Sequence, residues 1–438
     1  MTRKSMFTFR IGVSPLIVAV SSIGLILATT TSSLAAKTFT VNSTSDHSDT
    51  KRGDGVCLAS NGKCTLRAAI QESNALSGRD VIKLPAGTYK LTNAAGNLII
   101  TDSLAIDGVT ASQAIIDGSS SPRFQIGLIV GGDNISPIVN ISGITVRNFK
   151  EGGGIYVYQK AYLSLNRSTI TGNSSSTGGG IASNGSVDII DSIISNNGRD
   201  GETARGGGIA SSSAGTLKLV NSTVSGNAST GGAGINSSGK LEITNSTISG
   251  NKAGRGGGGI QNTGTAWISY STITENVAYS RSEFNNTDAF GGGIKNVGGT
   301  VDLGNSILAR NSDNRDLRFD NLASPDCSGD ITSFRGNLVG INKNCTIMDS
   351  TWGDTRFDQV GTVNSPIDPR LAGLANNGGR TQTHALLSGS PAIDKGDGIT
   401  SATFFDCPKT DQRGTSRPLD GKGSGKPICD VGAYEFKR

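Results

Sequence analysis

Ser246-Thr247-Ile248-Ser249-Gly250-Asn251, followed by Gly257-Gly258-Gly259-Ile260, is the stretch that decides the fold of this chain. Both motifs recur at a regular spacing, so the sequence carries an internal repeat. The second motif or a near copy of it ends at Ile155, Ile181, Ile209, Ile235, Ile260 and Ile294. The Asn that closes the first motif recurs at Asn173, Asn197, Asn227, Asn251, Asn276 and Asn311. Successive Asn residues are 24, 30, 24, 25 and 35 positions apart, which indicates a period of 24 or 25 with two insertions.

Within each period, apolar and polar residues alternate over short runs that turn residues separate. Leu217 and Leu219 share one face of such a run, and Lys218 lies on the other. This alternation predicts β-strands with one buried face. Leucine-rich repeats need more fixed Leu positions than this period offers, and a propeller blade needs about 40 residues. The sequence therefore predicts an all-β fold, a right-handed parallel β-helix whose coils stack about 4.8 Å apart.

Stacked coils place equivalent side chains on top of one another. The Asn residues of the repeat are then expected to form a ladder of side-chain amides, each bonded to the next. An apolar residue three positions before each Asn forms a column in the predicted core, namely Ile170, Ile194, Val224, Ile248, Ile273 and Leu308.

The composition excludes some functions. Gly accounts for 62 of 438 residues, without the strict period of collagen. The net charge of +5 is small for this length and the basic residues do not cluster, so nucleic acid is not an expected partner. No cofactor is expected either.

The N-terminus has the order of a secretory signal. Basic residues precede an apolar run over residues 15–28, and Ala35 or Ala36 offers a cleavage site. The alternative is an uncleaved anchor, but the run is short for a membrane span. No later stretch is apolar enough to span a membrane. The protein is therefore expected outside the cell or at the cell surface, with outer-membrane association as one form of that location.

Six cysteines follow the signal, and they fall into three local pairs. In an exported chain an even number favours disulfides, although six cysteines allow 15 connectivities. Pairing of nearest neighbours is favoured because the pairs lie in separate regions, at Cys57 and Cys64, Cys327 and Cys345, and Cys407 and Cys429. No metal site is expected, because His47 and His384 are far from these pairs in the sequence.

Three segments resemble known families. The repeat over about 144–311 resembles that of polymorphic outer-membrane proteins, which implies a β-helix. Cys64-Thr65-Leu66-Arg67-Ala68-Ala69-Ile70 resembles the CSLREA domain, with Ala68 in place of the family's Glu. Here Thr65 is expected to cap a short helix that covers the first coil. The C-terminal part resembles the choice-of-anchor Q domain in Asn377-Gly378-Gly379, Thr383-His384-Ala385-Leu386, Ser390-Pro391-Ala392-Ile393-Asp394, Asp411-Gln412-Arg413-Gly414 and Cys429-Asp430-Val431-Gly432-Ala433-Tyr434-Glu435.

These observations divide the chain into four parts: a signal at 1–36, a CSLREA-like cap at 37–80, β-helix repeats at 81–320 and a disulfide-stapled C-terminal region at 321–438. In the last part, His384 is interpreted as a structural hydrogen-bonding residue, and Asp411 and Arg413 as a local structural pair.

Export, a long repetitive side wall and the resemblances favour adhesion or binding of an extracellular polysaccharide or matrix. The alternatives are a polysaccharide-degrading lyase or hydrolase and a purely structural extracellular protein, since a β-helix by itself does not define a function.

One outward column of the repeat carries the residues that distinguish these hypotheses. It contains Ser164, Asp188, Lys218, Glu242, Trp267 and Asp302. Asp188 and Glu242 lie two coils apart, about 9.6 Å, near the upper limit for an inverting glycosidase. Lys218 stands between them, which favours a solvent-facing ladder of charges over an acid–base pair. No residue is therefore assigned as catalytic, and Trp267 is the candidate for binding, as a platform for a sugar ring. The alternative for Trp267 is lateral cover for the loop inserted between Tyr279 and Asp288.

The pairing of cysteines has a direct test. Three disulfides make the intact exported protein lighter by about six hydrogen masses than its reduced form. Mass spectrometry with and without reductant measures this difference. Six thiols that react with an alkylating agent in the native protein would contradict the pairing.

Overall fold

The computed structural model describes residues 36–92, 96–198, 205–279, 291–314, 326–350, 357–396 and 405–438. Residues from Ala35 to Arg438 form one compact unit. The predicted signal segment and both insertions of the repeat lie largely outside the described residues.

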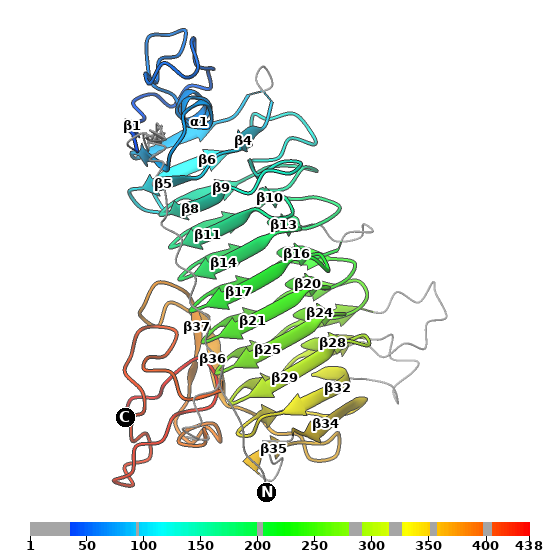
Figure 1. The fold of residues 1–438 in the computed structure, drawn as a ribbon. Coiled ribbons are helices and arrows are strands. Elements are labelled where there is room, and N and C mark those ends of the chain that lie inside the picture. Colours follow the sequence, from blue (N-terminus) through cyan, green and yellow to red (C-terminus); the bar gives the residue numbers. More distant parts are fainter. Residues whose placement is uncertain are drawn as a thin grey trace, which may run out of the picture. The chain divides into compact units, whose positions relative to one another are not determined.

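The repeat folds into coils that each contribute one strand to three parallel sheets, here named A, B and C (Figure 1). Along the chain each coil passes from sheet C to sheet A and then to sheet B.

The strands of sheet A are β1 (Thr38–Thr40), β2 (Asp80–Leu84), β5 (Leu104–Gly108), β8 (Ile138–Ser142), β11 (Tyr162–Asn166), β14 (Ser186–Ile190), β17 (Thr216–Val220), β21 (Lys240–Thr244), β25 (Thr265–Ser269), β29 (Thr300–Gly304), β32 (Cys327–Ser333) and β34 (Cys345–Asp349). Those of sheet B are β3 (Gly87–Lys90), β6 (Ala114–Asp117), β9 (Thr145–Arg147), β12 (Thr169–Thr171), β15 (Ile193–Ser195), β18 (Thr223–Ser225), β22 (Thr247–Ser249), β26 (Thr272–Thr274), β30 (Ile307–Ala309), β33 (Leu338–Val339) and β35 (Gln359–Val360). Sheet C contains β4 (Leu98–Ile100), β7 (Leu128–Val130), β10 (Ile155–Val157), β13 (Ile181–Ser183), β16 (Ile209–Ser211), β20 (Ile235–Ser237), β24 (Ile260–Asn262) and β28 (Ile294–Asn296), and it also pairs with β32. A short fourth sheet consists of β19 (Ala228–Ser229), β23 (Lys252–Ala253), β27 (Val277–Tyr279) and β31 (Ser312–Asn314).

The inward side chains form one apolar core along the stack. Every residue of the predicted Ile column is fully buried, and so are Leu217, Leu219, Leu241 and Ile243 of sheet A. The predicted all-β parallel β-helix and its inward face are therefore confirmed.

The Asn column forms the predicted ladder. The Nδ2 atom of Asn173 donates to Oδ1 of Asn197 at 3.1 Å, and the same contact recurs in each following coil down to Asn311. Each Nδ2 also donates to a backbone carbonyl of the preceding coil. Asn311 donates in turn to the carboxylate of Asp326 at 2.9 Å, so the ladder ends on a buried acid.

A second ladder, of serines, joins sheets A and B. The backbone N–H of Ser168 donates to Oγ of Ser192 at 3.1 Å, and the contact repeats through Ser222, Ser246, Ser271 and Ser306. Asn337 takes the next place and accepts from Ser306. These hydroxyls satisfy backbone groups that a buried corner would otherwise leave unpaired.

A helix caps the first coils. The helix α1 (Leu66–Ala75) begins after Thr65, whose hydroxyl accepts a hydrogen bond from the backbone of Ala68, as predicted. Its buried Arg67 pairs with Asp46 at 2.6 Å. Strand β1 lies before this helix in the chain and pairs with β2, so sheet A already begins within the segment expected to be only a cap.

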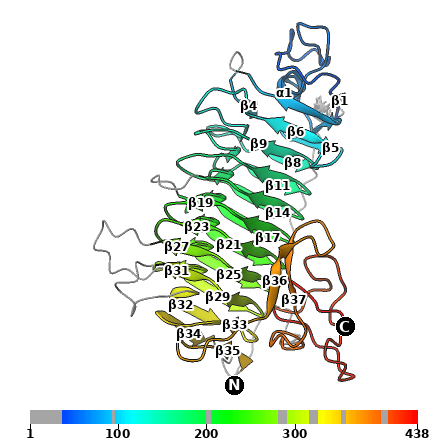
Figure 2. The same ribbon diagram turned by 180° about the vertical axis from the view of Figure 1, so that it is seen from behind.

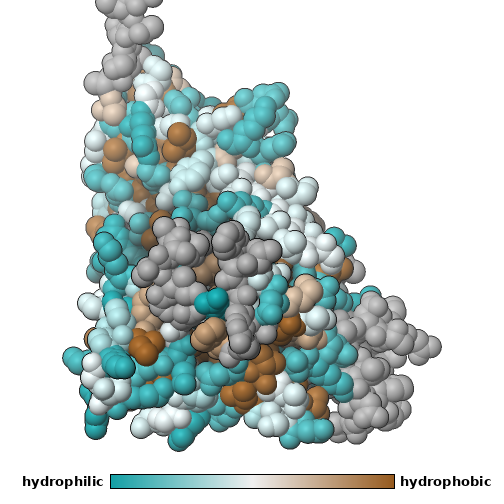
Figure 3. All heavy atoms as spheres, turned by 60° about the horizontal axis from the view of Figure 1, so that its bottom comes forward, coloured by the Kyte–Doolittle hydropathy of each residue, from teal (hydrophilic) through white to brown (hydrophobic). Residues whose placement is uncertain are grey.

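The solenoid continues into the C-terminal region, past residue 320. Strand β30 pairs with β33 and β33 with β35, so the coils reach Val360 because the backbone of each strand still finds a neighbour there. Strand β34 is an outer strand of sheet A, and its Met348 is exposed. Seen from this end, the surface carries apolar residues among hydrophilic ones (Figure 3).

The chain after the last coil folds back along the stack (Figures 1 and 2). Strands β36 (Leu371–Ala375) and β37 (Thr383–Leu386) form an antiparallel hairpin. This C-terminal segment, described over residues 365–396 and 405–438, lies against the outer face of sheet B: Thr223 donates to the carbonyl of Gln382, and Thr247 donates to Gln412. The disulfides join Cys57 to Cys64, Cys327 to Cys345 and Cys407 to Cys429, the nearest-neighbour pairing that the sequence favoured.

The buried column makes a stability prediction. Ile248→Asp places an unpaired charge in the core, so the free energy of unfolding should fall by at least about 4 kcal/mol. Denaturant unfolding monitored by circular dichroism measures the change. Thr265→Asp is the matched control, because Thr265 faces outward beside Lys240 in the register of sheet A. Equal losses for the two variants would contradict the assignment of inward and outward positions.

Candidate functional site

The outward column predicted from the sequence lies on sheet A in the expected register. Ser164 pairs with Asp188, Asp188 with Lys218, and Lys218 with Glu242. Trp267 follows Glu242, and Asp302 follows Trp267. All six side chains lie half-buried on the outer face of the sheet, which we call the sheet A face. The structure therefore brings the candidate residues together along one line parallel to the stack.

Asp188 is held by an aromatic neighbour. Tyr162, at the start of β11, donates its hydroxyl hydrogen to Oδ2 of Asp188 at 2.7 Å. Burial, followed by the hydrogen bond and the charge of Asp188, raises the pKa of Tyr162 to about 12. The phenol therefore stays protonated and keeps donating to the carboxylate at any physiological pH.

The cation that neutralises Glu242 differs from the expected one. Lys240, in the same strand, places Nζ 2.6 Å from Oε1 of Glu242. Lys218 has no ion pair with Asp188 or Glu242 within 4.0 Å, so the predicted charge ladder through Lys218 is wrong in its contacts although its register is right. Residues at positions one and three of a strand share a face, and this lets the long Lys240 side chain reach Glu242.

Lys240 also connects the charged part of the face to Trp267. Its Nζ lies 4.9 Å from the centroid of the indole ring, within the range of a cation–π contact. On the other side of the indole, burial raises the pKa of Asp302, while hydrogen bonds from Trp267 and Thr332 oppose this rise. Trp267 thus lies between a cation and a partly buried carboxyl group. The sequence could have indicated Lys240, because the alternation of apolar and polar residues places it on the outward face of the strand one coil before Trp267.

This arrangement suits binding better than acid–base chemistry. A general acid must carry a proton, whereas the 2.6 Å ion pair of Glu242 requires a charged carboxylate. Within the described ranges, no group of three or more His, Cys, Asp or Glu side chains is arranged to hold a metal ion.

The residues singled out in the C-terminal segment are structural. The buried His384 contacts Oγ of Ser249 through Nε2 at 2.8 Å and the carbonyl of Ala372 through Nδ1 at 2.7 Å. Arg413 donates twice to Asp411 Oδ2, at 2.8 and 2.6 Å. His384 therefore attaches the C-terminal segment to sheet B, and Arg413 and Asp411 stabilise the segment itself. These contacts agree with the interpretation from the sequence.

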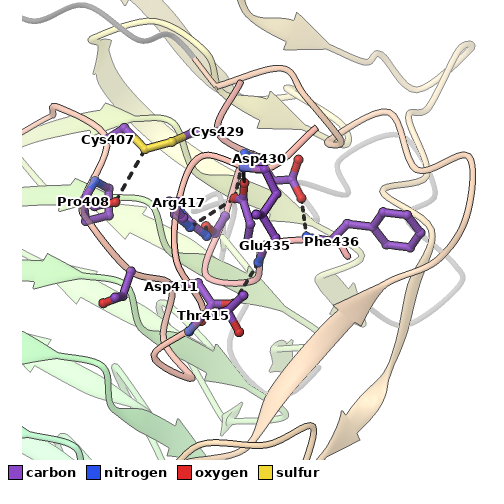
Figure 4. A network of polar contacts seen from close by, with 12 residues as sticks. Cys407, Pro408, Asp411, Thr415, Arg417, Cys429, Asp430, Glu435 and Phe436 are labelled. Atoms are coloured by element: carbon purple, nitrogen blue, oxygen red, sulfur yellow. Dashed lines mark hydrogen bonds and ion pairs between the residues drawn. A yellow bond between two sulfur atoms is a disulfide. The ribbon is translucent and has the colours of Figure 1, made fainter. Parts of the chain in front are cut away.

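A buried ionic cluster beside these residues was not foreseen (Figure 4). Arg417 pairs with Glu435 at 3.2 Å, and both side chains are completely buried. Glu435 accepts from the backbone of Asp430 and of Leu419. No local pattern predicts this cluster, because Arg417, Asp430 and Glu435 are 5 to 18 residues apart in turns without a regular period.

The pKa of Asp430 is raised from its ordinary value of 3.8 to about 7. Burial is the largest cause, and the charge of Glu435 is the second. Backbone hydrogen bonds from Asp394 and Phe436 act in the opposite direction. Burial likewise raises the pKa of Asp326, at the end of the Asn ladder, to about 6.

Comparison with known proteins supports the architecture. The family model described as "Right handed beta helix region" matches residues 126–303. A search of curated proteins found no match. The structure is similar to the crystal structure of pectate lyase Pel9A, with a TM-score of 0.51 and 16% identity, covering 92% of this chain and 96% of that one. Among the described helices, none has the length and apolar character needed to traverse a bilayer. At this identity, the similarity to Pel9A establishes the β-helix fold alone.

The raised pKa of Asp430 predicts how stability depends on pH. The folded state holds this proton up to about pH 7, whereas the unfolded chain releases it near pH 4. The contribution of Asp430 to the free energy of unfolding is therefore fully present below about pH 4. A few kcal/mol of that free energy are lost as the pH rises to about 7. In Asp430→Asn, the decrease in the free energy of unfolding between about pH 4 and pH 7 that Asp430 causes should be absent. Urea unfolding at several pH values measures this.

The control for this experiment is Asp420→Asn, because Asp420 is exposed and backbone hydrogen bonds lower its pKa. Between pH 5 and 8 this variant should keep the slope of the wild type. The interpretation fails if Asp430→Asn retains the full wild-type slope over that range.

Proposed function

We propose that this chain is an exported carbohydrate-binding protein that uses the sheet A face to hold an extracellular polysaccharide or matrix glycan. The observation that carries the proposal is the group formed by Trp267, Lys240 and Asp302 at the centre of a polar face. An aromatic ring bounded by hydrogen-bonding and charged groups is suited to a sugar, whose ring has apolar faces and a polar rim.

The face continues beyond the indole. The outward residues of β11, β14, β17 and β21 supply a phenol, two carboxylates and two ammonium groups along four successive coils. Coils follow one another at about 4.8 Å, so the face repeats its hydrogen-bonding groups on the scale of single sugar residues in an extended chain. Lys240, whose side chain is 47% exposed, can contact an acidic substituent of the ligand while it remains near the indole.

Export and surface location form part of the proposal. The basic and apolar N-terminus and the three disulfides support an oxidising, extracytoplasmic location. The resemblances to the CSLREA domain, to the repeats of polymorphic outer-membrane proteins and to the choice-of-anchor Q domain support a role at the cell surface, either in adhesion or in matrix binding.

Polysaccharide cleavage and a purely structural role are the alternatives. The similarity to pectate lyase Pel9A is one of fold, and one fold supports many activities. On the sheet A face, Asp188 and Glu242 are both engaged with neighbours, which argues against an acid–base pair.

Trp267→Ala tests the proposal. In a glycan-array screen followed by affinity measurements on the polysaccharide found, this variant should bind at least about tenfold more weakly, because it loses a large desolvated contact. Trp267→Phe keeps an aromatic ring and should retain most of the affinity. Thermal unfolding of both variants establishes that the fold is retained.

The same ligand should be incubated with the wild type and with the double variant Asp188→Asn, Glu242→Gln, and the products measured by size-exclusion chromatography. No release of oligosaccharides is expected from either protein. Cleavage by the wild type that the folded double variant has lost would replace the binding proposal with an enzymatic one. Absence of any glycan ligand would favour the structural role.

A further inference from the structure

One corner of the solenoid, between sheets A and B, holds a residue of positive φ in each of six successive coils. The six are Arg167, Asp191, Asn221, Asn245, Tyr270 and Asn305, with φ between 45° and 51°. Three of them are Asn, the side chain other than Gly that adopts this conformation most readily. Arg, Asp and Tyr are less favoured at such a corner, so these three positions call for a reason in the surrounding structure.

The surrounding structure supplies such a reason for two of the three residues that are not Asn. Tyr270 is fully buried beneath the C-terminal segment, with the guanidinium of Arg417 5.2 Å from its ring centroid. Asp191 accepts a hydrogen bond from Asn221 at 3.2 Å and pairs with Arg380 at 3.7 Å. Arg167 is exposed, and its guanidinium has no hydrogen bond or ion pair within the described part of the chain. Nothing in the packing therefore accounts for an arginine at this corner.

Arg167 lines a cleft of about 350 Å³ between the solenoid and the tip of the C-terminal hairpin. Arg380 lines the cleft from the hairpin side, so two arginines contribute to the lining of one space. Thr169 adds a hydroxyl that is not used by other described residues, and Ser142 lies on the preceding coil. The single carboxylate in the lining is that of Asp191, which neutralises only one of the two cations.

The hairpin tip is held firmly over this corner. Thr381, next to Arg380, donates to the carbonyl of Asn221 at 2.9 Å and accepts from Gln412 at 2.9 Å. Gly379 has φ of +80°, and a Cβ atom there would lie 2.6 Å from Cα of Arg413. The cleft is therefore preorganised, since Arg380 is presented from a backbone that the segment itself fixes.

We propose that this cleft is an anion-binding site that takes the carboxylate or sulfate group of an acidic polysaccharide, with Arg167 as the principal contact. The guanidinium fork matches the oxygen geometry of either group. This inference rests on the proposed function only for the identity of the ligand as a glycan; the site itself lies at the corner between sheets A and B, whereas Trp267 lies in the middle of a strand on the sheet A face.

Arg167→Asn is the decisive variant, because the corner already accepts Asn at positions 221, 245 and 305. Its melting temperature should equal or exceed that of the wild type. The probes are dextran sulfate, unmodified dextran, a polymer of glucuronic acid and sodium sulfate, each measured by isothermal titration calorimetry. The variant should bind the two acidic polymers about tenfold more weakly, the loss expected for one charged hydrogen-bonding contact.

A second variant acts in the opposite direction. Asp191→Asn removes the competing carboxylate while it keeps a side chain suited to positive φ, so binding of the acidic polymers should strengthen. Arg79→Gln is the matched control for loss of one exposed positive charge, and it should leave binding unchanged at 0.15 M salt, where distant charges are screened. Sodium sulfate binding that competes with the polymers places the anion itself in the cleft; polymer binding without such competition would mean that the sugar and not the anion is recognised, which overturns the inference.

The inference also fails if folded Arg167→Asn binds both acidic polymers as tightly as the wild type. That result would leave the sheet A face untouched, since the proposed function depends on Trp267. Conversely, loss of glycan binding in Trp267→Ala with sodium sulfate binding retained would separate the two sites.

Discussion

The structure depends on the exact repetition of coils, and the buried amide and hydroxyl ladders maintain that register. A buried turn leaves backbone groups that water cannot reach, and each would carry a substantial free-energy cost if it were unpaired. In this chain the Asn side chains join one coil to the next and also satisfy carbonyl groups of the preceding coil. The serine ladder does the same at the corner between sheets A and B. With both corners fixed, the Ile column stacks without offset and the outward columns are aligned as a consequence.

This regularity also explains where functional groups can be placed. An inward position accepts only an apolar residue of suitable size, and a ladder position accepts only a side chain that both donates and accepts. Outward positions on sheet A carry no such constraint, and there Trp267, Lys240 and Asp302 lie beside the charged and polar side chains of neighbouring coils. The corner between sheets A and B also accepts different side chains, although each residue there must adopt a positive φ. Arg167 occupies this corner without a partner in the described structure.

The C-terminal segment changes the character of sheet B. Its outward Thr and Ser residues would be solvent-exposed in a bare solenoid, yet Thr247 and Ser249 are buried against Gln412 and His384. The segment contains the ionic cluster of Arg417, Glu435 and Asp430, where burial raises the pKa of both carboxyl groups and lowers that of the guanidinium. One face of the solenoid is thereby covered by the chain itself, whereas the sheet A face keeps the group of Trp267, Lys240 and Asp302 on which the proposed function rests.

The sequence by itself determined the coil period, the inward Ile column, the Asn ladder, the capping Thr65 and the register that aligns Ser164 with Asp302. These features repeat or lie close together in the chain, so each is a local pattern that stacking merely copies. Only the tertiary structure decided that Lys240, and not Lys218, neutralises Glu242, since side-chain reach between neighbouring positions selects one of two cations. It also decided that the hairpin of the C-terminal segment folds back on sheet B and that Arg380 and Arg167 line one cleft. Such contacts join residues more than 150 positions apart, and no periodicity in a sequence records which distant surfaces will meet.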